Sequence, residues 1–216
     1  KYGHPTAEAM VESALDQIKI LEDINFNDII ISLKSTDIWM TIKAYKLMAK
    51  KRDYPFHIGI TEAGTPKKGV VKSSVGIGSL LTAGLGDTLR VSLTGSPLKE
   101  IKTSWNILES LDLRQKGIKI ISCPTCGRTN IDLVGLAERV EEKLEDIELP
   151  ITVAVMGCEV NGPGEAKEAD IGIAGGKKQG IIFKKGKQVK TVKEDKLLDT
   201  LLDEIEKLRS DFDETI

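Results

Sequence analysis

Apolar residues in the first half of the chain follow two alternating spacings. Stretches with an apolar residue every three or four positions predict amphipathic helices, and short apolar runs predict buried strands. The predicted elements are a helix over residues 6–21, a strand over 29–33, a helix over 36–51, a strand over 56–61, a turn-rich loop over 64–69, a helix over 74–83, a strand over 88–93 and a helix over 96–111. Strands that alternate with helices predict parallel βα units. Three such units cannot close an eight-unit barrel, which needs about 250 residues, so either the sheet is open or the rest of a barrel is missing.

The pattern changes from about Gly117 onward. The predicted elements there are a strand over residues 118–121, a helix over 131–146, strands over 151–155 and 171–173, a hairpin over 181–189 with Gly186 at its tip and an amphipathic helix that ends near residue 210. This order predicts a compact α+β domain. The whole chain is therefore predicted to be an α/β protein with two domains, residues 1–115 and residues 116–216.

The composition argues against several classes of protein. The 216 residues include 31 basic and 33 acidic side chains, with a net charge of -2, and only 4% are aromatic. Neither figure suits a surface that binds nucleic acid through its phosphates and its stacked bases. No stretch approaches the ~20 apolar residues of a membrane span, and no signal peptide is recognisable. Three cysteines cannot all pair within the chain, so we expect a cytoplasmic protein. The sequence begins with Lys1 rather than methionine, and we expect it to be a fragment.

The three cysteines are the strongest chemical signal. Cys123 and Cys126 form a C-x2-C hook, and Cys158 lies 32 positions further on, at the end of another predicted strand. The hook alone suits a thioredoxin-like redox pair, half of a zinc site or an iron–sulfur site. A zinc site needs four Cys or His ligands, and the second half of the sequence has no histidine and no fourth cysteine. A redox pair needs no third cysteine, whereas three thiolates suit an iron–sulfur cluster with one special iron. Glu165, after the tight turn Gly162–Gly164, is the candidate fourth ligand, although this segment also fits an ordinary surface turn.

Polar side chains in the first half fall where the predicted strands end. Lys34 follows the first strand and Glu62 the second, and Arg90 and Ser92 lie on the third. Because ligands of α/β folds bind at the carboxyl ends of strands, these residues predict a shared pocket. The two cations and the serine suit an anion such as phosphate, and the glutamate suits proton transfer. The alternative for each residue is a solvated strand end. His57 is more consistent with a packing or supporting residue than with a catalyst.

Four segments of the chain resemble the 4-hydroxy-3-methylbut-2-enyl diphosphate synthase family of the non-mevalonate isoprenoid pathway. They are Gly59–Gly64 (GITEAG), Gly86–Leu93 (GDTLRVSL), Ile121–Arg128 (ISCPTCGR) and Met156–Glu165 (MGCEVNGPGE). The resemblance covers essentially the whole chain. It implies that residues 1–115 are the last three βα units of a TIM barrel and that residues 116–216 are an iron–sulfur cluster domain.

The resemblance also implies a [4Fe-4S] cluster and the residues of a substrate pocket. The implied cluster ligands are Cys123, Cys126, Cys158 and Glu165. The implied pocket residues are Lys34, Arg90 and Ser92 for the diphosphate of the substrate and Glu62 as the proton donor.

The implied reaction is a reductive ring opening and dehydroxylation of 2-C-methyl-D-erythritol 2,4-cyclodiphosphate to 4-hydroxy-3-methylbut-2-enyl diphosphate. Its implied electron donor is ferredoxin or flavodoxin. The implied assembly is a homodimer in which the barrel of one subunit faces the cluster domain of the other. Because the earlier barrel strands are absent, we expect little turnover from this chain alone. From the residues alone, the alternative is a non-catalytic metal-binding module that holds an iron–sulfur cluster or zinc.

Overall fold

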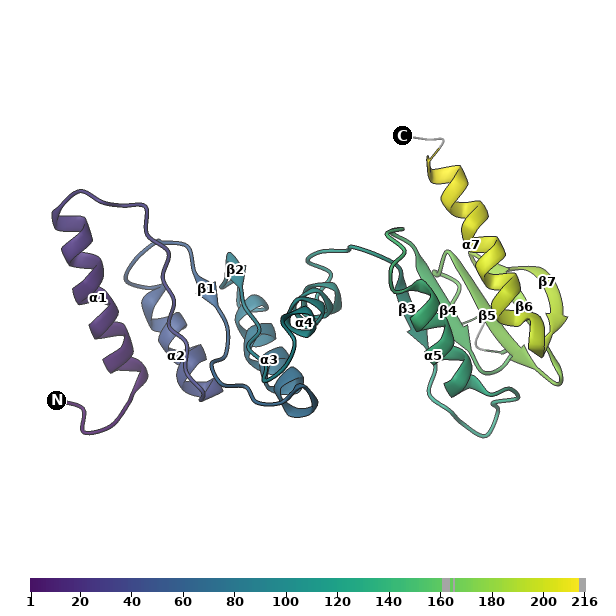
Figure 1. The fold of residues 1–216 in the computed structure, drawn as a ribbon, viewed down its shortest axis with the longest axis horizontal. Coiled ribbons are helices and arrows are strands. Elements are labelled where there is room, and N and C mark those ends of the chain that lie inside the picture. Colours follow the sequence, from purple (N-terminus) through teal and green to yellow (C-terminus); the bar gives the residue numbers. More distant parts are fainter. Residues whose placement is uncertain (161–163, 165, 214–216) are drawn as a thin grey trace. The chain divides into compact units, whose positions relative to one another are not determined.

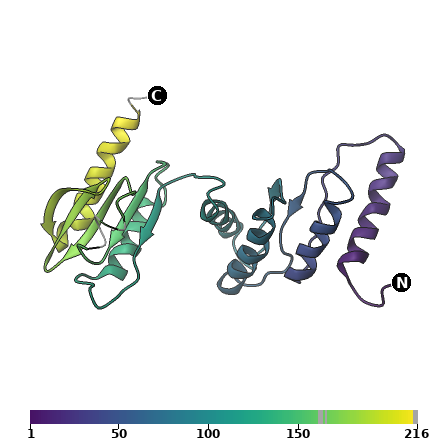
Figure 2. The same ribbon diagram turned by 180° about the vertical axis from the view of Figure 1, so that it is seen from behind.

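The computed structural model describes residues 1–160, 164 and 166–213, and the chain divides into two compact units, Lys1–Arg114 and Gln115–Ile216 (Figures 1 and 2). The first unit contains α1 (Ala7–Asp23), α2 (Ile38–Met48), β1 (His57–Ile58), α3 (Pro66–Leu81), β2 (Thr88–Leu89) and α4 (Pro97–Ser110). The second unit contains β3 (Lys119–Ser122), α5 (Leu133–Leu144), β4 (Thr152–Met156), β5 (Ile171–Gly176), β6 (Gln179–Lys184), β7 (Lys187–Lys193), the 3-10 helix η1 (Glu194–Lys196) and α7 (Leu197–Asp213). The predicted α/β class is therefore confirmed.

Helix α3 starts earlier than the sequence pattern predicts. The expected helix over 74–83 begins instead at Pro66, so its first turn takes in most of the loop predicted over 64–69. Proline is well suited to the first position of a helix, where its missing N–H leaves no hydrogen bond unmade. Gly69 then lies close against Leu93, where a Cβ would clash with the leucine side chain. Gly69 of this turn therefore serves close packing rather than a loop.

The sheet of the first unit consists of three parallel segments. The segment around Ile31 pairs with Phe56 through an isolated bridge, and β1 pairs with β2. The Arg90 N–H donates to the Ile58 carbonyl at 2.9 Å, so the parallel pairing of the two strands continues one residue beyond β2. One face of the sheet packs against the helices. The buried apolar residues on that face are Ile29, Ile31, Leu33, Ile58 and Val91, which pack with Ile77 and Leu80 of α3.

The hydroxyl group of Tyr45 lies between two of these segments. It accepts a hydrogen bond from the Leu33 N–H at 3.0 Å and donates one to the His57 carbonyl at 2.6 Å. In an uninterrupted parallel ladder the Leu33 N–H would donate directly to that carbonyl. The inserted hydroxyl therefore separates the two segments, and the strand predicted over 29–33 forms a single bridge. Tyr45 is fully buried, and its ring meets Phe56 edge-on with centroids 5.2 Å apart.

The second unit is built on a five-stranded sheet in the order β3-β4-β5-β6-β7. Strands β3, β4 and β5 are parallel, and β6 and β7 follow as antiparallel hairpins. Helices α5 and α7 lie on one face of this sheet (Figure 1), where their apolar residues pack against Val153, Val155 and Ile173. Because β3 and β4 are parallel, their carboxyl ends meet at one edge of the sheet. Both cysteine motifs begin at that edge.

A buried carboxylate attaches α7 to the last two strands. Glu204 accepts hydrogen bonds from Lys184 of β6, Lys190 of β7 and Lys207 of α7, with N···O distances of 2.7 to 2.8 Å. These three bonds hold the pKa of the Glu204 carboxyl well below its usual range. The carboxylate therefore stays ionised, and the helix is fixed on its face of the sheet.

Removing the Tyr45 hydroxyl should destabilise the first unit. We expect Tyr45→Phe to lower its free energy of unfolding by about 1–3 kcal/mol, because the Leu33 N–H and the His57 carbonyl would lose a buried partner. Both tryptophans, Trp39 and Trp105, belong to this unit. Urea unfolding followed by tryptophan fluorescence therefore reports on it, and hydrogen exchange of the Leu33 amide reports on the bond itself.

A matched control is Tyr54→Phe. The Tyr54 hydroxyl contacts Glu22 and Asn27 at 3.2 and 3.3 Å, and these bonds lie nearer the surface. We expect this variant to stay within about 0.5 kcal/mol of the parent. Equal losses in the two variants, or unchanged exchange at Leu33 in Tyr45→Phe, would contradict the role given to the buried hydroxyl.

Candidate functional site

The face of the first sheet that the helices leave open carries polar side chains. Successive side chains of a strand point to opposite faces, so alternate residues of each segment share this face. His57 lies opposite Thr88 in the parallel register. Two residues further along these strands, Gly59 lies beside Arg90. A Cβ at position 59 would come within 3.2 Å of the Lys34 side chain and would clash with the Arg90 carbonyl oxygen. The absence of a side chain here lets the Lys34 side chain and the Arg90 backbone approach Gly59 from the two neighbouring segments.

Lys34 and Arg90 form a pair of like charges at this point. Partial burial lowers the pKa of Lys34, and the neighbouring guanidinium lowers it further. Neither cation forms an ion pair with a carboxylate in the part of the chain that the structure describes. Two adjacent cations without a counter-ion favour an anionic ligand, and the planar guanidinium matches the oxygens of phosphate.

The other two predicted pocket residues lie nearby along the same strands. Ser92 follows Arg90 by two residues, which gives it the same face, and it is half-buried. Glu62 is exposed in the turn after β1, where its φ of 52° lies in the left-handed region that residues other than glycine seldom adopt. The structure thus brings the two cations together and leaves Glu62 beyond the carboxyl end of the sheet.

His57 belongs to the same open face. Its Nδ1 lies 2.9 Å from the Thr88 Oγ1. From the sequence, His57 is predicted to be a packing or supporting residue, because it is isolated in sequence. The sequence signal that could have assigned His57 to this face is the alternation of apolar and other residues along its strand. Ile58 and Ile60 are both fully buried, so His57 and Gly59 must share the opposite face.

The cysteines lie at the carboxyl ends of two adjacent parallel strands in the second unit. Cys123 follows β3 directly and opens residues 123–130, here called the hook loop. The Gly157 N–H, just after β4, donates to the Cys123 sulfur at 3.3 Å, and the Cys123 N–H donates to the Val155 carbonyl at 3.4 Å. Cys158 is the next residue, 5% exposed. The pairing of β3 with β4 therefore brings the hook loop and the second motif to one place.

Cys126 is the exposed member of the three. The backbone N–H of Arg128 lowers the pKa of the Cys126 thiol most, followed by the Arg128 guanidinium, and the Thr129 hydroxyl contributes as well. The Cys126 N–H in turn donates to the Thr129 Oγ1 at 3.1 Å. The hook loop is thus arranged so that the thiolate, which is the form that binds metals, is favoured at its tip.

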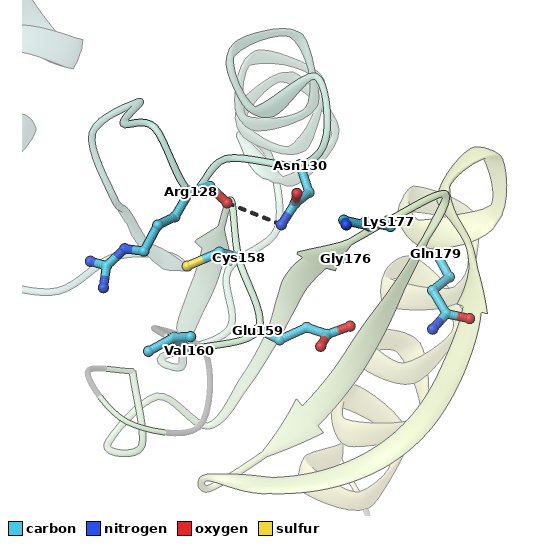
Figure 3. Close-up of a pocket in the computed structure, with 8 residues that line it drawn as sticks. All are labelled: Arg128, Asn130, Cys158, Glu159, Val160, Gly176, Lys177 and Gln179. Carbon is cyan, nitrogen blue, oxygen red and sulfur yellow. Dashed lines mark hydrogen bonds between the residues drawn. The ribbon is translucent and has the colours of Figure 1, made fainter.

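A pocket of about 490 Å³ opens beside Cys158 (Figure 3). Its lining residues are Arg128, Asn130, Cys158, Glu159, Val160, Gly176, Lys177 and Gln179. The sulfur of Cys158 points to the side of the hook loop, while the Glu159 carboxylate points toward Gln179 of β6 (Figure 3). The pocket therefore offers a thiol and groups of both charges within one cavity.

The donor set of this edge fits an iron–sulfur cluster in its chemistry. Thiolates are the usual ligands of such clusters. The Gly157 N–H already donates to the Cys123 sulfur, and the backbone N–H of Arg128 lowers the pKa of the Cys126 thiol most. Glu165, the predicted fourth ligand, lies outside the described residues. Within residues 1–160, 164 and 166–213, no three Cys, His, Asp or Glu side chains form a group that could hold a metal ion.

Comparison with known families decides the relationship of the chain. A family model described as the GcpE TIM-barrel domain matches residues 1–105, and one described as the GcpE protein C-terminal domain matches residues 119–207. The chain belongs to the GcpE family. This membership confirms the resemblance stated from the four sequence motifs.

Curated relatives carry one name, 4-hydroxy-3-methylbut-2-en-1-yl diphosphate synthase (flavodoxin). The relative from Geobacter sulfurreducens is 58% identical over 208 residues, which is 96% of this chain and 59% of that protein. The relative from Caldanaerobacter subterraneus is 59% identical over 208 residues, with the same two shares. This chain of the GcpE family thus spans about 59% of the length of these relatives. Across the described ranges, every helix is too short or too polar to cross a membrane.

The hook loop yields a prediction about thiol reactivity. In the metal-free chain at pH 7 we expect iodoacetamide to alkylate Cys126 first, because its thiol is exposed and its pKa is lowered, and Cys158 last, because it is buried. Peptide mapping by mass spectrometry after short exposures measures the order.

Arg128→Gln provides the control for the cause. This variant keeps the backbone N–H and removes the guanidinium, so the rate at Cys126 should fall roughly two- to fivefold while the other two thiols are unaffected. If Cys158 of the folded chain reacted as fast as Cys126, this result would contradict the burial of Cys158.

Proposed function

We propose that this chain is part of an enzyme that converts 2-C-methyl-D-erythritol 2,4-cyclodiphosphate into 4-hydroxy-3-methylbut-2-enyl diphosphate. The conversion opens the ring, takes up two electrons and two protons and releases one water. The observation that carries the proposal is the 58% identity over 208 residues to a protein named for this product. The geometry supports it, since a cation pair and a set of thiols occupy the strand ends of the two units.

The first unit would bind the substrate. We assign Lys34 and Arg90 to the diphosphate, because they lie on the two segments that border Gly59, their charges act on each other, and they carry no carboxylate partner among the described residues. Ser92, on the same face, adds a hydroxyl donor. Glu62 is the proposed proton donor, held in a left-handed turn beyond the strand end.

We further propose that the first unit forms the last three βα units of a TIM barrel. One apolar residue supports this: Ile30 is 62% exposed on the open face, in a position that further barrel strands would cover. The open face would then be the barrel interior, and the cations would lie at the carboxyl ends of the strands, where TIM-barrel active sites are found.

The second unit would hold a [4Fe-4S] cluster through Cys123, Cys126, Cys158 and Glu165. When bound, such a cluster supplies low-potential electrons and a Lewis-acidic iron for the departing oxygen. The Gly157 N–H would donate to the Cys123 sulfur, and the backbone N–H of Arg128 would favour the thiolate of Cys126. The printed name of the relatives favours flavodoxin as electron donor, with ferredoxin as the other candidate. We place the enzyme in the cytoplasm as a homodimer.

Reconstitution tests the cluster. Anaerobic treatment of the chain with iron and sulfide should give a brown protein with labile sulfide. Its absorbance should show a broad band at roughly 400 nm, as expected for a thiolate-bound cluster. Cys158→Ala should lose most of this absorbance, and Glu165→Ala should lose it or change it strongly. Ser122→Ala, an exposed neighbour of the hook loop, serves as the matched control and should load normally. A colourless, zinc-loaded protein without sulfide would instead favour the non-catalytic metal module.

Turnover in the intact enzyme tests the substrate site. With a chemical reductant as electron source, Lys34→Met should lower kcat/KM for the cyclodiphosphate by about 10- to 100-fold, because a charged contact to the diphosphate is lost. Lys46→Met, which removes an exposed lysine of α2, should leave kcat/KM unchanged. Equal effects of the two substitutions would exclude Lys34 from the site.

A further inference from the structure

His57 lies on the same face of the sheet as the two cations, close enough for both charges to act on its ring. It precedes Gly59 by two residues on the middle segment of the sheet, so both belong to the open face. Gly59 is the position that the Lys34 side chain and the Arg90 backbone approach. The imidazole therefore forms the next level of the same surface, one step toward the amino ends of the strands. The residue beside His57 on β2 is Thr88, which has a small side chain.

Two hydrogen bonds hold His57 in place. Its carbonyl accepts from the buried Tyr45 hydroxyl at 2.6 Å, and its ring Nδ1 lies 2.9 Å from the Thr88 Oγ1. The first bond fixes the backbone and the second fixes the ring. When the threonine hydroxyl donates to Nδ1, the ring proton resides on Nε2, which is then a fixed donor without a protein partner among the described residues.

Burial and the charges around the ring favour its neutral form. Burial lowers the pKa of His57 most, and the positive charges of Lys34, on the first segment, and of Arg90, on the third, lower it further. The carboxylate that comes nearest along the third segment is Asp87, which is engaged with the Phe56 N–H at 2.7 Å. A neutral imidazole adds a hydrogen-bond donor to the cation pair without adding a third positive charge.

We propose that His57 is a further anion-binding residue, whose Nε2–H donates to a phosphate oxygen of the ligand seated between Lys34 and Arg90. Phosphate oxygens only accept hydrogen bonds, so a fixed donor below a cation pair complements them. The ring sets the depth and orientation of the anion, while the cations supply the attraction. This inference rests on the proposed diphosphate site and adds a residue to it.

The chain offers a direct spectroscopic test, because it contains two histidines, His4 and His57. His4 is exposed and distant in sequence from the site, and it serves as the internal reference. In ¹H–¹⁵N spectra of the imidazoles, sodium pyrophosphate should shift the His57 signals and leave those of His4 in place. The ¹⁵N shifts of His57 should report the Nε2–H form at pH 7.5.

A second measurement uses sulfate, because its charge stays constant between about pH 5 and pH 8, the range in which an imidazole titrates. Saturating sulfate should raise the His57 pKa, because the bound anion offsets the two cations that lower it. Lys34→Met should raise the His57 pKa without any anion and should abolish the further effect of sulfate. A purely structural histidine would show neither response.

Two substitutions separate the ring nitrogens. Gln at position 57 places its amide near the Nε2 position, and Asn places its amide near Nδ1. We expect His57→Gln to keep pyrophosphate affinity within about threefold of the parent and His57→Asn to lose about tenfold, as measured by calorimetry. His4→Gln, the control, should bind as the parent does.

The outcomes distinguish this inference from the proposed function. Pyrophosphate binding that depends on Lys34 but leaves the His57 signals unmoved would overturn the role of His57 and keep the diphosphate site. Pyrophosphate binding that does not depend on Lys34, or no binding at all, would overturn both.

Discussion

The Tyr45 hydroxyl accepts the Leu33 N–H and donates to the His57 carbonyl, and the open face of the first unit is organised around that pair of bonds. One buried side chain from α2 thus joins two strand segments that would otherwise pair directly. The bond fixes the backbone of His57, and with it the strand on which Gly59 follows. The spacing between Lys34 and Arg90 across Gly59 depends on this strand. A core tyrosine therefore sets the geometry of a polar surface on the other side of the sheet.

The two units position chemistry by one shared constraint. Parallel strands bring their carboxyl ends to the same edge, whatever lies between them in sequence. In the first unit this edge collects Lys34 and Arg90, which are 56 positions apart. In the second unit it collects Cys123 and Cys158, and the N–H of Gly157 reaches the Cys123 sulfur across the strand pair. Cations are collected in one unit and thiols in the other, which suits a division between binding an anion and holding a metal group.

Much of this arrangement could be predicted from the sequence, because periodicity and caps are local. The starts of α1, α2 and α4 follow from a polar cap at Thr6, Asp37 and Ser96, each of which accepts a first-turn N–H. The strand ends that carry the predicted site residues follow from short apolar runs. The prediction that was wrong, the start of α3, depends on tertiary contacts. The early start of α3 reflects close packing at Gly69, which resembles a loop residue until its neighbour Leu93 is known.

Other features had an incomplete sequence signal or none. Tyr45 shares a helix face with ordinary core residues, and its hydroxyl bonds become visible only once α2 lies on the sheet. His57 looked isolated because its partners, Thr88 and the two cations, are distant in sequence. The role of Glu165 stays a prediction, since that residue lies outside the described part of the chain.

The cation pair explains why this face has the form of a binding site rather than of a core. Placing Lys34 partly buried and near Arg90 costs free energy, since burial lowers the pKa of the lysine most and the guanidinium lowers it further. A surface selected for stability alone would separate these charges or insert a carboxylate between them. Here the residue between their segments is a glycine, which the Lys34 side chain approaches closely, and a neutral imidazole stands one level below. An anion that binds to both cations relieves the repulsion, so the cost present in the free protein becomes a contribution to affinity and selects ligands by their charge.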